Sequence, residues 1–388
     1  MEKPDFNRSI VNLMSSILGS FEVKSQYQPL ESLPVSKLRK YKNVILLVID
    51  GMGYNFLENE VPNSLLNENK IDKLTSVFPT TTASAITTFM TGDAPQQHAI
   101  TGWNMWLKEL GMLTTILPFR ARCGERLNNA AMFSANVFKS QSVFSKIKSQ
   151  SFYLIPKSLS GSVYSNWHSK GSLLKPVKNA GELFNTIYKC TQINNRKKYI
   201  YSYWPNYDHL AHQHGYNSSS AVQHFGQLES HLKLLCKQLE KTSSLLLVTA
   251  DHGFVNTSKD KVIFIEDHPI LSDCLMIPLC GEARLAYCYV KPNCEKEFLE
   301  YIKNELKEVC EVSSSLEVLE NNYFGLGEIE PALLDRIGTY ILFMKDNYVI
   351  KDRLVGETHE FHPGRHGGCS ENEMYVPLIS FEFDGEKI

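Results

Sequence analysis

The sequence lacks several features that would place it in a specialised class of protein. It has no apolar run long enough to span a membrane, no C-x-x-C pair, no internal repeat and no low-complexity segment. Its 40 basic and 42 acidic residues give a net charge of −2, so no overall field would attract long nucleic acids or anionic membranes. The N-terminal stretch carries acidic residues and interrupts its apolar positions with Asn and Ser, unlike a signal peptide. We therefore expect a cytoplasmic protein without a membrane span.

The cysteines show no pattern of a disulfide framework or a metal-binding knuckle. Their number is odd and their spacing is scattered, at positions 123, 190, 236, 274, 280, 288, 294, 310 and 369. Such scatter favours reduced thiols in a cytosolic protein. We expect no zinc site built from thiolates.

Five apolar, β-branched runs recur along the chain and predict buried strands. They cover residues 44–49, 151–155, 199–204, 245–250 and 376–381. Between the third and fourth runs, apolar residues repeat at helical spacing over 221–239. Strands that alternate with helices predict an α/β fold with a mostly parallel central sheet and helices on both faces.

The length of 388 residues exceeds that of one ordinary core, so we expect one large domain with an insertion. Residues 1–40 are assigned to a helical segment packed on the core, with an amphipathic helix over 7–18. Residues 41–260 and 351–388 are assigned to the α/β core. Residues 261–350 mix short strand-like runs with a surface helix over 295–309, without regular alternation. They are assigned to a small α+β insertion, a cap.

The run FPTTTASAITTFMTG, residues 78–92, combines a helix start with three consecutive hydroxyls. Pro79 ends an extended entry, apolar residues follow at helical spacing, and Gly92 stands where the helix is expected to stop. A hydroxyl at a helix start faces free backbone N–H groups and the positive end of the helix dipole, which favour an alkoxide or a bound phosphate. A Thr there is also a preferred N-cap. The run alone leaves both roles open.

Acids and histidines stand near the ends of the expected strands. The set consists of Asp50, Asp208, His212, Asp251, His252 and His366. Each is weak alone, because a buried His is more often structural than a ligand. Together they could hold two cations, and imidazole with carboxylate but no thiolate favours Zn²⁺, with Mn²⁺ or Fe²⁺ as alternatives. Two metals ~4 Å apart clamp the attacking and leaving oxygens of a phosphoryl transfer, and a threonine hydroxyl needs a metal or a base to attack.

The chain resembles the alkaline phosphatase superfamily, nearest its type I phosphodiesterase/nucleotide pyrophosphatase branch. The matching pieces, in the family's order over residues 44–368, are VILLVIDGMG, FPTTTASAITTFMTGDAPQQHAI, YWPNYDHLAHQHG, TADHGF and GRHGG. The resemblance implies that Thr82 is the nucleophile and also contacts metal. It implies one metal site of Asp50, Asp251 and His252, and another of Asp208, His212 and His366. The implied activity is hydrolysis of a phosphodiester or pyrophosphate bond in a small phosphate ester of nucleotide type, through a phosphothreonine that water then hydrolyses.

The segment after the expected nucleophile helix departs from that branch. The branch places an Asn there to hold a phosphate oxygen, and Asn104 stands one residue out of that register. Trp103 and Trp106 flank Asn104 on what we expect to be a loop over the site. They either stack on a base of the substrate or fill the core.

Other readings stay open at this point. A phosphomonoesterase, phosphonate hydrolase or phosphomutase could use the same scaffold, although the Arg or Lys that monoesters need is not identifiable. The Cys-x-Pro-x-Arg signature of sulfatases is absent, which argues against sulfate esters. An idle binding protein is disfavoured because every ligand and nucleophile position is filled. The remaining histidines His98, His359 and His362 are expected to be structural, with His362 as a reserve ligand.

Overall fold

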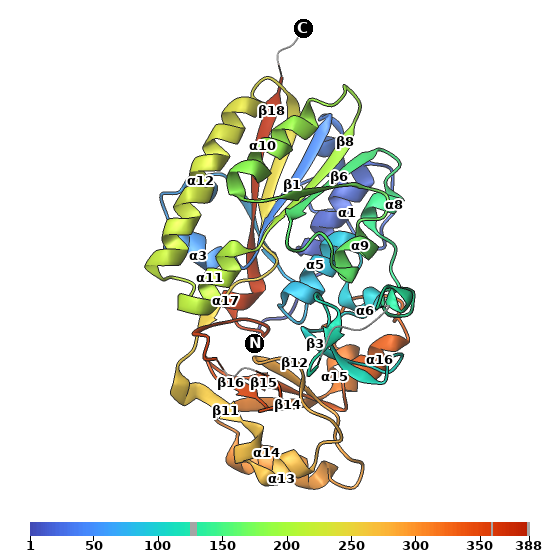
Figure 1. The fold of residues 1–388 in the computed structure, drawn as a ribbon, viewed down its shortest axis with the longest axis vertical. Helices are drawn as coiled ribbons and strands as arrows, with labels where there is room; N and C mark the ends of the chain where they lie inside the picture. Colours follow the sequence, from blue (N-terminus) through green and yellow to red (C-terminus); the bar gives the residue numbers. More distant parts are fainter. Residues whose placement is uncertain (125–129, 358–359, 386–388) are drawn as a thin grey trace.

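The computed structural model describes residues 1–124, 130–357 and 360–385. In these ranges there are two main sheets of seven strands each, and the large sheet of the core is the one with the longer strands (Figure 1). In spatial order they are β2 (Lys70–Thr75), β18 (Tyr375–Asp384), β9 (Ser243–Thr249), β1 (Asn43–Ile49), β8 (Lys198–Trp204), β6 (Gln150–Pro156) and β7 (Leu173–Val177). Strands β9, β1, β8, β6 and β7 pair in parallel, whereas β18 runs antiparallel to both neighbours. The predicted α/β fold with a mostly parallel sheet is confirmed.

The central strand β1 shows why this sheet could be predicted from the sequence. All seven of its residues are buried, because β8 and β9 flank it at the sides and helices cover the sheet above and below. Its side chains therefore need no polar alternation, and the strand reads as an uninterrupted Val/Ile/Leu run. In the parallel register Ile49 lies opposite Trp204, so neighbouring strands end at the same edge.

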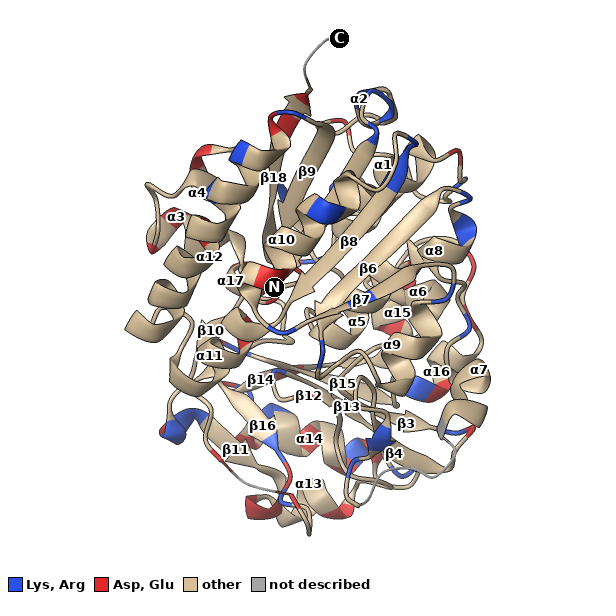
Figure 2. Cartoon of the chain, turned by 45° about the horizontal axis from the view of Figure 1, so that its top comes forward, with Lys and Arg blue, Asp and Glu red and all other residues tan. Residues whose placement is uncertain are grey.

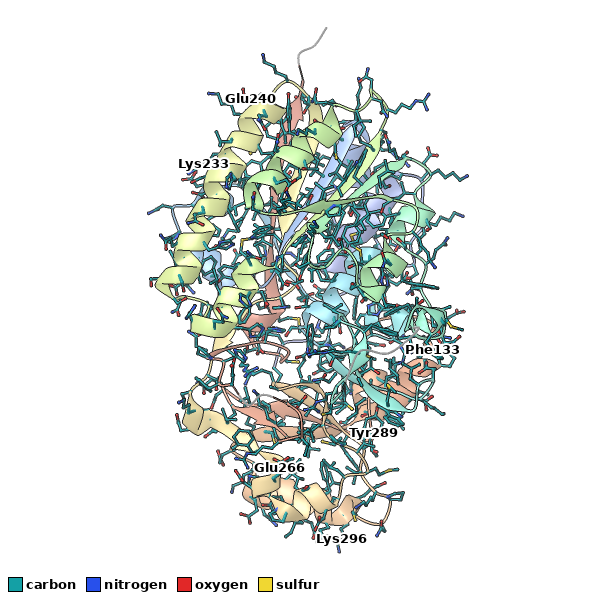
Figure 3. All side chains as sticks on the ribbon, in the orientation of Figure 1. Phe133, Lys233, Glu240, Glu266, Tyr289 and Lys296 are labelled. Carbon is teal, nitrogen blue, oxygen red and sulfur yellow. The ribbon has the colours of Figure 1, made fainter. Side chains whose placement is uncertain are left out.

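Helices lie on both faces of this sheet, with α10 and α12 on one side and α1 and α5 on the other (Figure 1). The longer helices are α1 (Ile10–Ser20), α5 (Thr82–Thr91), α10 (Ala180–Thr191), α11 (Asn206–His214), α12 (Ser219–Leu239) and α14 (Glu295–Glu305). The shorter ones are α2 (Val35–Arg39), α3 (Tyr54–Asn59), α4 (Leu65–Glu68), α6 (Pro95–His98), α7 (Ser134–Val137), α8 (Val143–Lys146), α9 (Val163–His168), α13 (Pro269–Asp273), α15 (Ser315–Glu320), α16 (Ala332–Arg336) and α17 (Glu371–Met374). Side chains fill the layers between helices and sheet (Figure 3).

Helix α1 differs from the amphipathic helix expected over residues 7–18. It begins at Ile10, behind a capping box in which Ser9 and Asn12 satisfy each other's backbone N–H groups. All but one of its residues are buried, since α2 and α5 pack against it. The helix is therefore part of the main core. Its serines are buried as well, although polar residues at these positions predicted an exposed face.

The second sheet forms the cap and is antiparallel throughout. Its strands in order are β14 (Cys310–Ser314), β15 (Tyr340–Met344), β13 (Leu285–Cys288), β12 (Cys280–Glu282), β3 (Asn104–Leu107), β4 (Met112–Thr115) and β5 (Arg120–Ala121). Three of these strands come from residues 104–121, so an insertion confined to 261–350 is not confirmed. The prediction of a loop around Trp103 and Trp106 is also wrong. From Asn104 the chain is a strand that buries Met105 and Leu107 on alternate positions. These two side chains join the main core, and this period-2 burial decides the conformation.

Two short strand pairs connect the layers. Strand β10 (Val255–Asn256) pairs with β17 (Gly364–Arg365), and β11 (Val262–Phe264) pairs with β16 (Val349–Lys351). Basic and acidic residues are interspersed over both the core and the cap (Figure 2). Within the described ranges, no helix is both long and apolar enough to cross a membrane.

Candidate active site

The first group of candidate ligands lies where two adjacent parallel strands end. Asp50 follows β1, and Asp251 and His252 come just after β9. The backbone N–H of Gly51 donates to Asp251 Oδ1 at 2.9 Å, which ties the two strand ends together. His252 Nε2 lies 3.4 Å from Asp50 Oδ1 and 3.5 Å from Asp251 Oδ2. Ligand sites in open parallel sheets gather at this edge.

The second group of candidate ligands comes from a helix and from the end of a strand that is distant in sequence. Asp208 and His212 lie on one face of α11, which follows β8, with Asp208 Oδ1 3.5 Å from His212 Nε2. His366 follows β17 and brings its Nε2 to 3.2 Å from that of His212. The approach requires Gly364, because a Cβ there would lie 2.1 Å from the carbonyl oxygen of Ala211.

All three histidines direct the same nitrogen inward. Their Nδ1 atoms lie against backbone carbonyls, at 3.1 Å for His252 and Gly253, 2.9 Å for His212 and Gly364, and 3.2 Å for His366 and Thr80. A carbonyl only accepts, so Nδ1 carries the proton and Nε2 presents its lone pair to the carboxylates. Burial lowers the pKa of His212 to about 3 and that of His366 well below its usual value. Both imidazoles are therefore neutral, the form that binds metals.

The carboxylates supply the test of whether metals fit. Asp50 Oδ1, Asp208 Oδ1 and Asp251 Oδ2 are buried and accept no hydrogen bond from any described residue. The other oxygen of Asp50 accepts from the Tyr203 hydroxyl. Burial and then the neighbouring carboxylates raise the pKa of Asp50 and Asp208 well above the usual value. Buried acids with unused oxygens need cations to be ionised together.

The two groups adjoin one another. In each, one atom per residue lies within 4.8 Å of the others, and the rings of His252 and His366 stack with centroids 3.8 Å apart. The donor set of three acids and three imidazoles thus fits divalent cations that prefer oxygen and nitrogen ligands.

Thr82 is the first residue of α5 and faces the first group, with its hydroxyl 3.1 Å from His252 Nε2. The two preceding threonines are committed elsewhere. The Thr80 hydroxyl donates to the Gly368 carbonyl at 2.8 Å, and that of Thr81 donates to Glu282. Thr81 is the N-cap residue but makes no side-chain cap, so among the described residues the helix start keeps N–H groups free for an anion.

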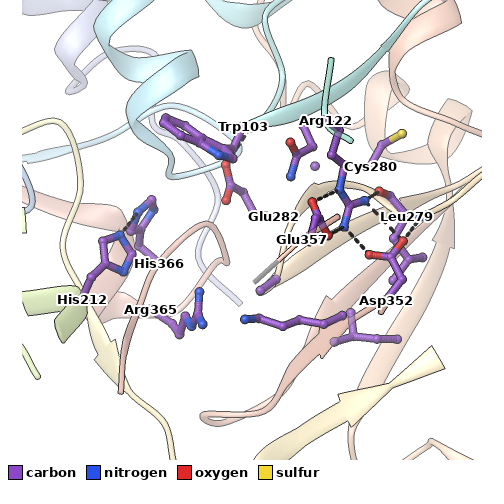
Figure 4. A pocket seen from close by; sticks show the side chains of 15 residues that line it. Trp103, Arg122, His212, Leu279, Cys280, Glu282, Asp352, Glu357, Arg365 and His366 are labelled. Carbon is purple, nitrogen blue, oxygen red and sulfur yellow. Dashed lines mark hydrogen bonds and ion pairs between the residues drawn. The ribbon is translucent and has the colours of Figure 1, made fainter. Parts of the chain in front are cut away.

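Two cavities open beside these groups, and Trp103 lines both. The larger has a volume of about 850 Å³ and reaches Asp50, Thr82 and Asp208. The smaller has a volume of about 200 Å³ and is lined by His212 and His366 on one side and cap residues on the other (Figure 4). The site thus offers separate spaces to the two sides of a bound molecule.

Sequence reasoning missed several residues here. Glu282 lies on β12 of the cap, accepts from the Trp103 backbone N–H at 2.8 Å, and has its pKa raised to about 7 by burial. Arg365 and Lys351 line the smaller cavity and supply the positive charge that the sequence did not identify. Arg365 lies in the GRHGG piece and could have been noticed. No local pattern marks Lys351 or Glu282, because packing of the cap brings them to the site.

The remaining predicted residues fall in different places. Asn104 lines the smaller cavity and accepts from the Thr115 hydroxyl at 3.0 Å. Trp106 packs against the cap core and is not among the residues that line either cavity. His98 is buried and accepts from the Ile100 N–H at 3.0 Å. The His362 ring lies 6.1 Å from that of His212, between centroids, and His359 is outside the described residues.

A third group lies apart from the site, at α13 and α14 of the cap (Figure 1). It brings Cys274, Cys294 and Glu297 within 4.8 Å of one another, which the scattered cysteine spacing did not suggest. All nine cysteines are free thiols in the structure.

Comparison with known proteins agrees with this arrangement. The family model described as type I phosphodiesterase / nucleotide pyrophosphatase matches residues 44–368. No curated protein matches the chain in sequence.

Solved structures share the fold at low identity. Human ectonucleotide pyrophosphatase/phosphodiesterase 5 superposes with a TM-score of 0.65 at 16% identity, covering 88% of this chain and 89% of that one. An inactive variant of the murine protein, in complex with AMP, gives 0.62 at 17% identity over 86% and 87% of the two chains. Phosphonoacetate hydrolase from Sinorhizobium meliloti 1021, in complex with phosphonoformate, gives 0.63 at 16% identity over 88% and 90%.

Proposed function

Because the chain belongs to the type I phosphodiesterase/nucleotide pyrophosphatase family of hydrolytic enzymes, we propose that it cleaves a phosphodiester or pyrophosphate bond of a small, nucleotide-type substrate. The observation that carries this proposal is the hydroxyl of Thr82. It is the member of the threonine run that faces the buried acids and histidines, at the start of a helix whose first N–H groups are free.

The proposed reaction runs through a covalent enzyme. Thr82 Oγ attacks phosphorus, and the ester or anhydride oxygen leaves and takes up the proton that the hydroxyl releases. The phosphoryl group, which in a diester still carries its second ester group, is held on Thr82 as an ester of phosphothreonine until water displaces it and restores the hydroxyl. The N–H groups at the start of α5 donate to the equatorial phosphoryl oxygens, where charge develops. The larger cavity, which reaches Thr82, receives the organic group.

Two divalent cations, with Zn²⁺ the best match and Mn²⁺ or Fe²⁺ as alternatives, are proposed at the two groups. One would be held by Asp50, Asp251 and His252 beside Thr82, and the other by Asp208, His212 and His366. When bound, they would polarise the phosphoryl oxygens and lower the pKa of the attacking hydroxyl and of water.

The test has two readouts. Turnover of bis-p-nitrophenyl phosphate, p-nitrophenyl phosphate and p-nitrophenyl nucleotide esters is measured across several metals, and the diester or nucleotide ester should be preferred. Acid quenching during turnover, followed by peptide mass analysis, should find on the peptide that contains Thr82 the phosphoryl group together with the ester group that the substrate retains. Turnover without any such adduct, or with the adduct on another residue, would contradict the mechanism.

Phosphonate hydrolysis is a second candidate. The positive charge of Arg365 and Lys351 next to the histidines supports it, since phosphomonoesters and phosphonates carry more charge than diesters. Release of inorganic phosphate from phosphonoacetate, at a rate above that for the esters, would favour it.

A further inference from the structure

The smaller cavity has an unusual charge balance. Its cationic lining residues are Arg122, Lys351 and Arg365, and its acidic ones are Glu282, Asp352 and Glu357. Equal numbers would suggest a neutral pocket. Their pairing shows otherwise.

The acids of the cavity are already engaged. Arg122 binds both Asp352 and Glu357, with Nε 2.8 Å from Glu357 Oε1. This Arg122 network is visible as dashed contacts in Figure 4, and none of them joins Arg365 to a lining side chain. Glu282 accepts from the Thr81 hydroxyl and the Trp103 N–H, both through Oε1, and it attracts Arg365 without forming an ion pair with it. Among the described residues, two of the three cations, Arg365 and Lys351, thus make no ion pair.

Arg365 is oriented by the backbone, and neither Arg365 nor Lys351 pairs with a described carboxylate. Arg365 Nε donates to the His362 carbonyl at 3.2 Å, which orients the guanidinium. Within the described ranges, its terminal nitrogens and Lys351 Nζ have no hydrogen-bond partner, and no carboxylate lies within 4.0 Å of either charge. Burial, and then the nearby Arg365, lowers the pKa of Lys351 to about 8. Two partly desolvated like charges on one cavity wall are unfavourable unless an anion joins them.

We propose that the smaller cavity binds a second anionic group of the substrate, a carboxylate or a phosphate, between Arg365 and Lys351. This inference rests on the proposed function, because His212 and His366 line the same cavity and place the second anion beside the reacting phosphoryl group. A guanidinium with two free terminal nitrogens matches the two oxygens of such a group. The cavity of about 200 Å³ suits a compact oxyanion, whereas the larger one of about 850 Å³ suits a bulkier organic group.

Calorimetric titration of the metal-loaded protein tests the inference independently of turnover. The probes are methylphosphonate, which has one anionic centre, phosphonoacetate, which adds a carboxylate, and methylenediphosphonate, which adds a second phosphonate. Each probe is also titrated into the same metal-containing buffer without protein, and this heat of chelation is subtracted. The wild-type protein should bind at least one two-centre probe ~10-fold or more tightly than methylphosphonate. The probe that gains affinity identifies the carboxylate or the phosphate as the second group.

Variants assign the gain to the two cations. Lys351→Met and Arg365→Met should each reduce the affinity ratio to below ~3, whereas Lys296→Met, on the exposed face of α14, should leave it unchanged. Because Arg365 precedes His366, Arg365→Lys serves as a second variant if Arg365→Met loses metal. A ratio near one in the wild type, or an unchanged ratio in Lys351→Met and Arg365→Lys, would overturn the inference. A preserved ratio in a protein that turns over no ester would instead remove the proposed function and leave the subsite in place.

Discussion

Thr81 and Thr82 are adjacent in sequence, yet the hydroxyl of Thr81 contacts Glu282 and that of Thr82 contacts His252. Alanine substitutions should therefore affect stability at Thr81 and activity at Thr82. Thr82→Ala removes the proposed nucleophile, and we expect turnover of bis-p-nitrophenyl phosphate to fall ~10³-fold or more. The lost hydroxyl contacts only His252 Nε2 among described residues. The free energy of unfolding should therefore change by less than ~1 kcal/mol.

Thr81→Ala should give the opposite pattern. The Thr81 hydroxyl donates to the buried carboxyl of Glu282. Above the folded pKa of Glu282, about 7, the acceptor is charged, and a hydrogen bond to a charged group contributes ~1.5–3 kcal/mol. In a chain of 388 residues, that loss corresponds to a melting temperature lowered by roughly 2–4 °C. Turnover should fall far less than in Thr82→Ala, because the proposed nucleophile is intact.

The assay pairs steady-state kinetics with thermal unfolding for both variants, and Thr82→Ser, which keeps a hydroxyl, is the matched control. We expect Thr82→Ser to retain part of the activity that Thr82→Ala loses. If Thr81→Ala were inactive while Thr82→Ala kept near wild-type turnover, the nucleophile would be Thr81. Equal losses of activity and stability in both variants would refute the division of roles.

Three further predictions concern the surroundings of the nucleophile. Burial raises the pKa of Glu282 to about 7 from its ordinary 4.5, so the folded protein retains a proton that the unfolded chain releases. The stability this proton contributes is full below the ordinary value and is lost as pH rises through the folded value. Glu282→Gln should therefore gain melting temperature relative to the wild type from pH ~5 to ~8, and a constant difference would contradict this. Asp208→Asn and His366→Ala should each bind about one metal ion fewer per chain, as measured by elemental analysis, and chelation should abolish activity reversibly. Full activity in chelator with no bound metal would refute the metal sites. Trp103→Ala should raise the Michaelis constant for nucleotide esters ~5- to 100-fold and leave small esters nearly unchanged, as expected for lost base stacking, whereas Trp106→Ala should mainly lower the melting temperature.

The large sheet could be predicted because its central strands are buried on both faces. Such strands appear as continuous apolar runs that need no tertiary information. Edge strands lack that signal. Strand β2 is partly exposed and contains charged residues, and β7 includes Lys175 and Pro176, so neither resembles a buried run. The candidate ligands were within reach for the same reason, because they follow the recognisable strands.

The cap side of the site could not be predicted in this way. Lys351, at the end of β16, and Glu282, on β12, reach the smaller cavity of the site only through packing between segments far apart in sequence. The segment of Trp103 and Asn104 was misjudged as a loop because its four-residue strand is too short to show alternation. Its partner Gly281 lies in a distant part of the chain.

The shared cap sheet has a consequence for how substrate preference can change in this protein. Strand β3, which follows the nucleophile helix within a short stretch, pairs with β12 from the later segment through Asn104 and Gly281. Replacing residues 261–350 with those of a relative would exchange only part of the cap sheet. The new β12 would then have to pair with the original β3 across the seam, the β3–β12 pair. A chimaera that exchanges residues 104–121 as well keeps the seam intact, and natural divergence of the cap should show compensating changes across it. Because Glu282 of β12 accepts hydrogen bonds from Thr81, the residue before α5, and from Trp103, the residue before β3, a graft that fits poorly would disturb the position of Thr82.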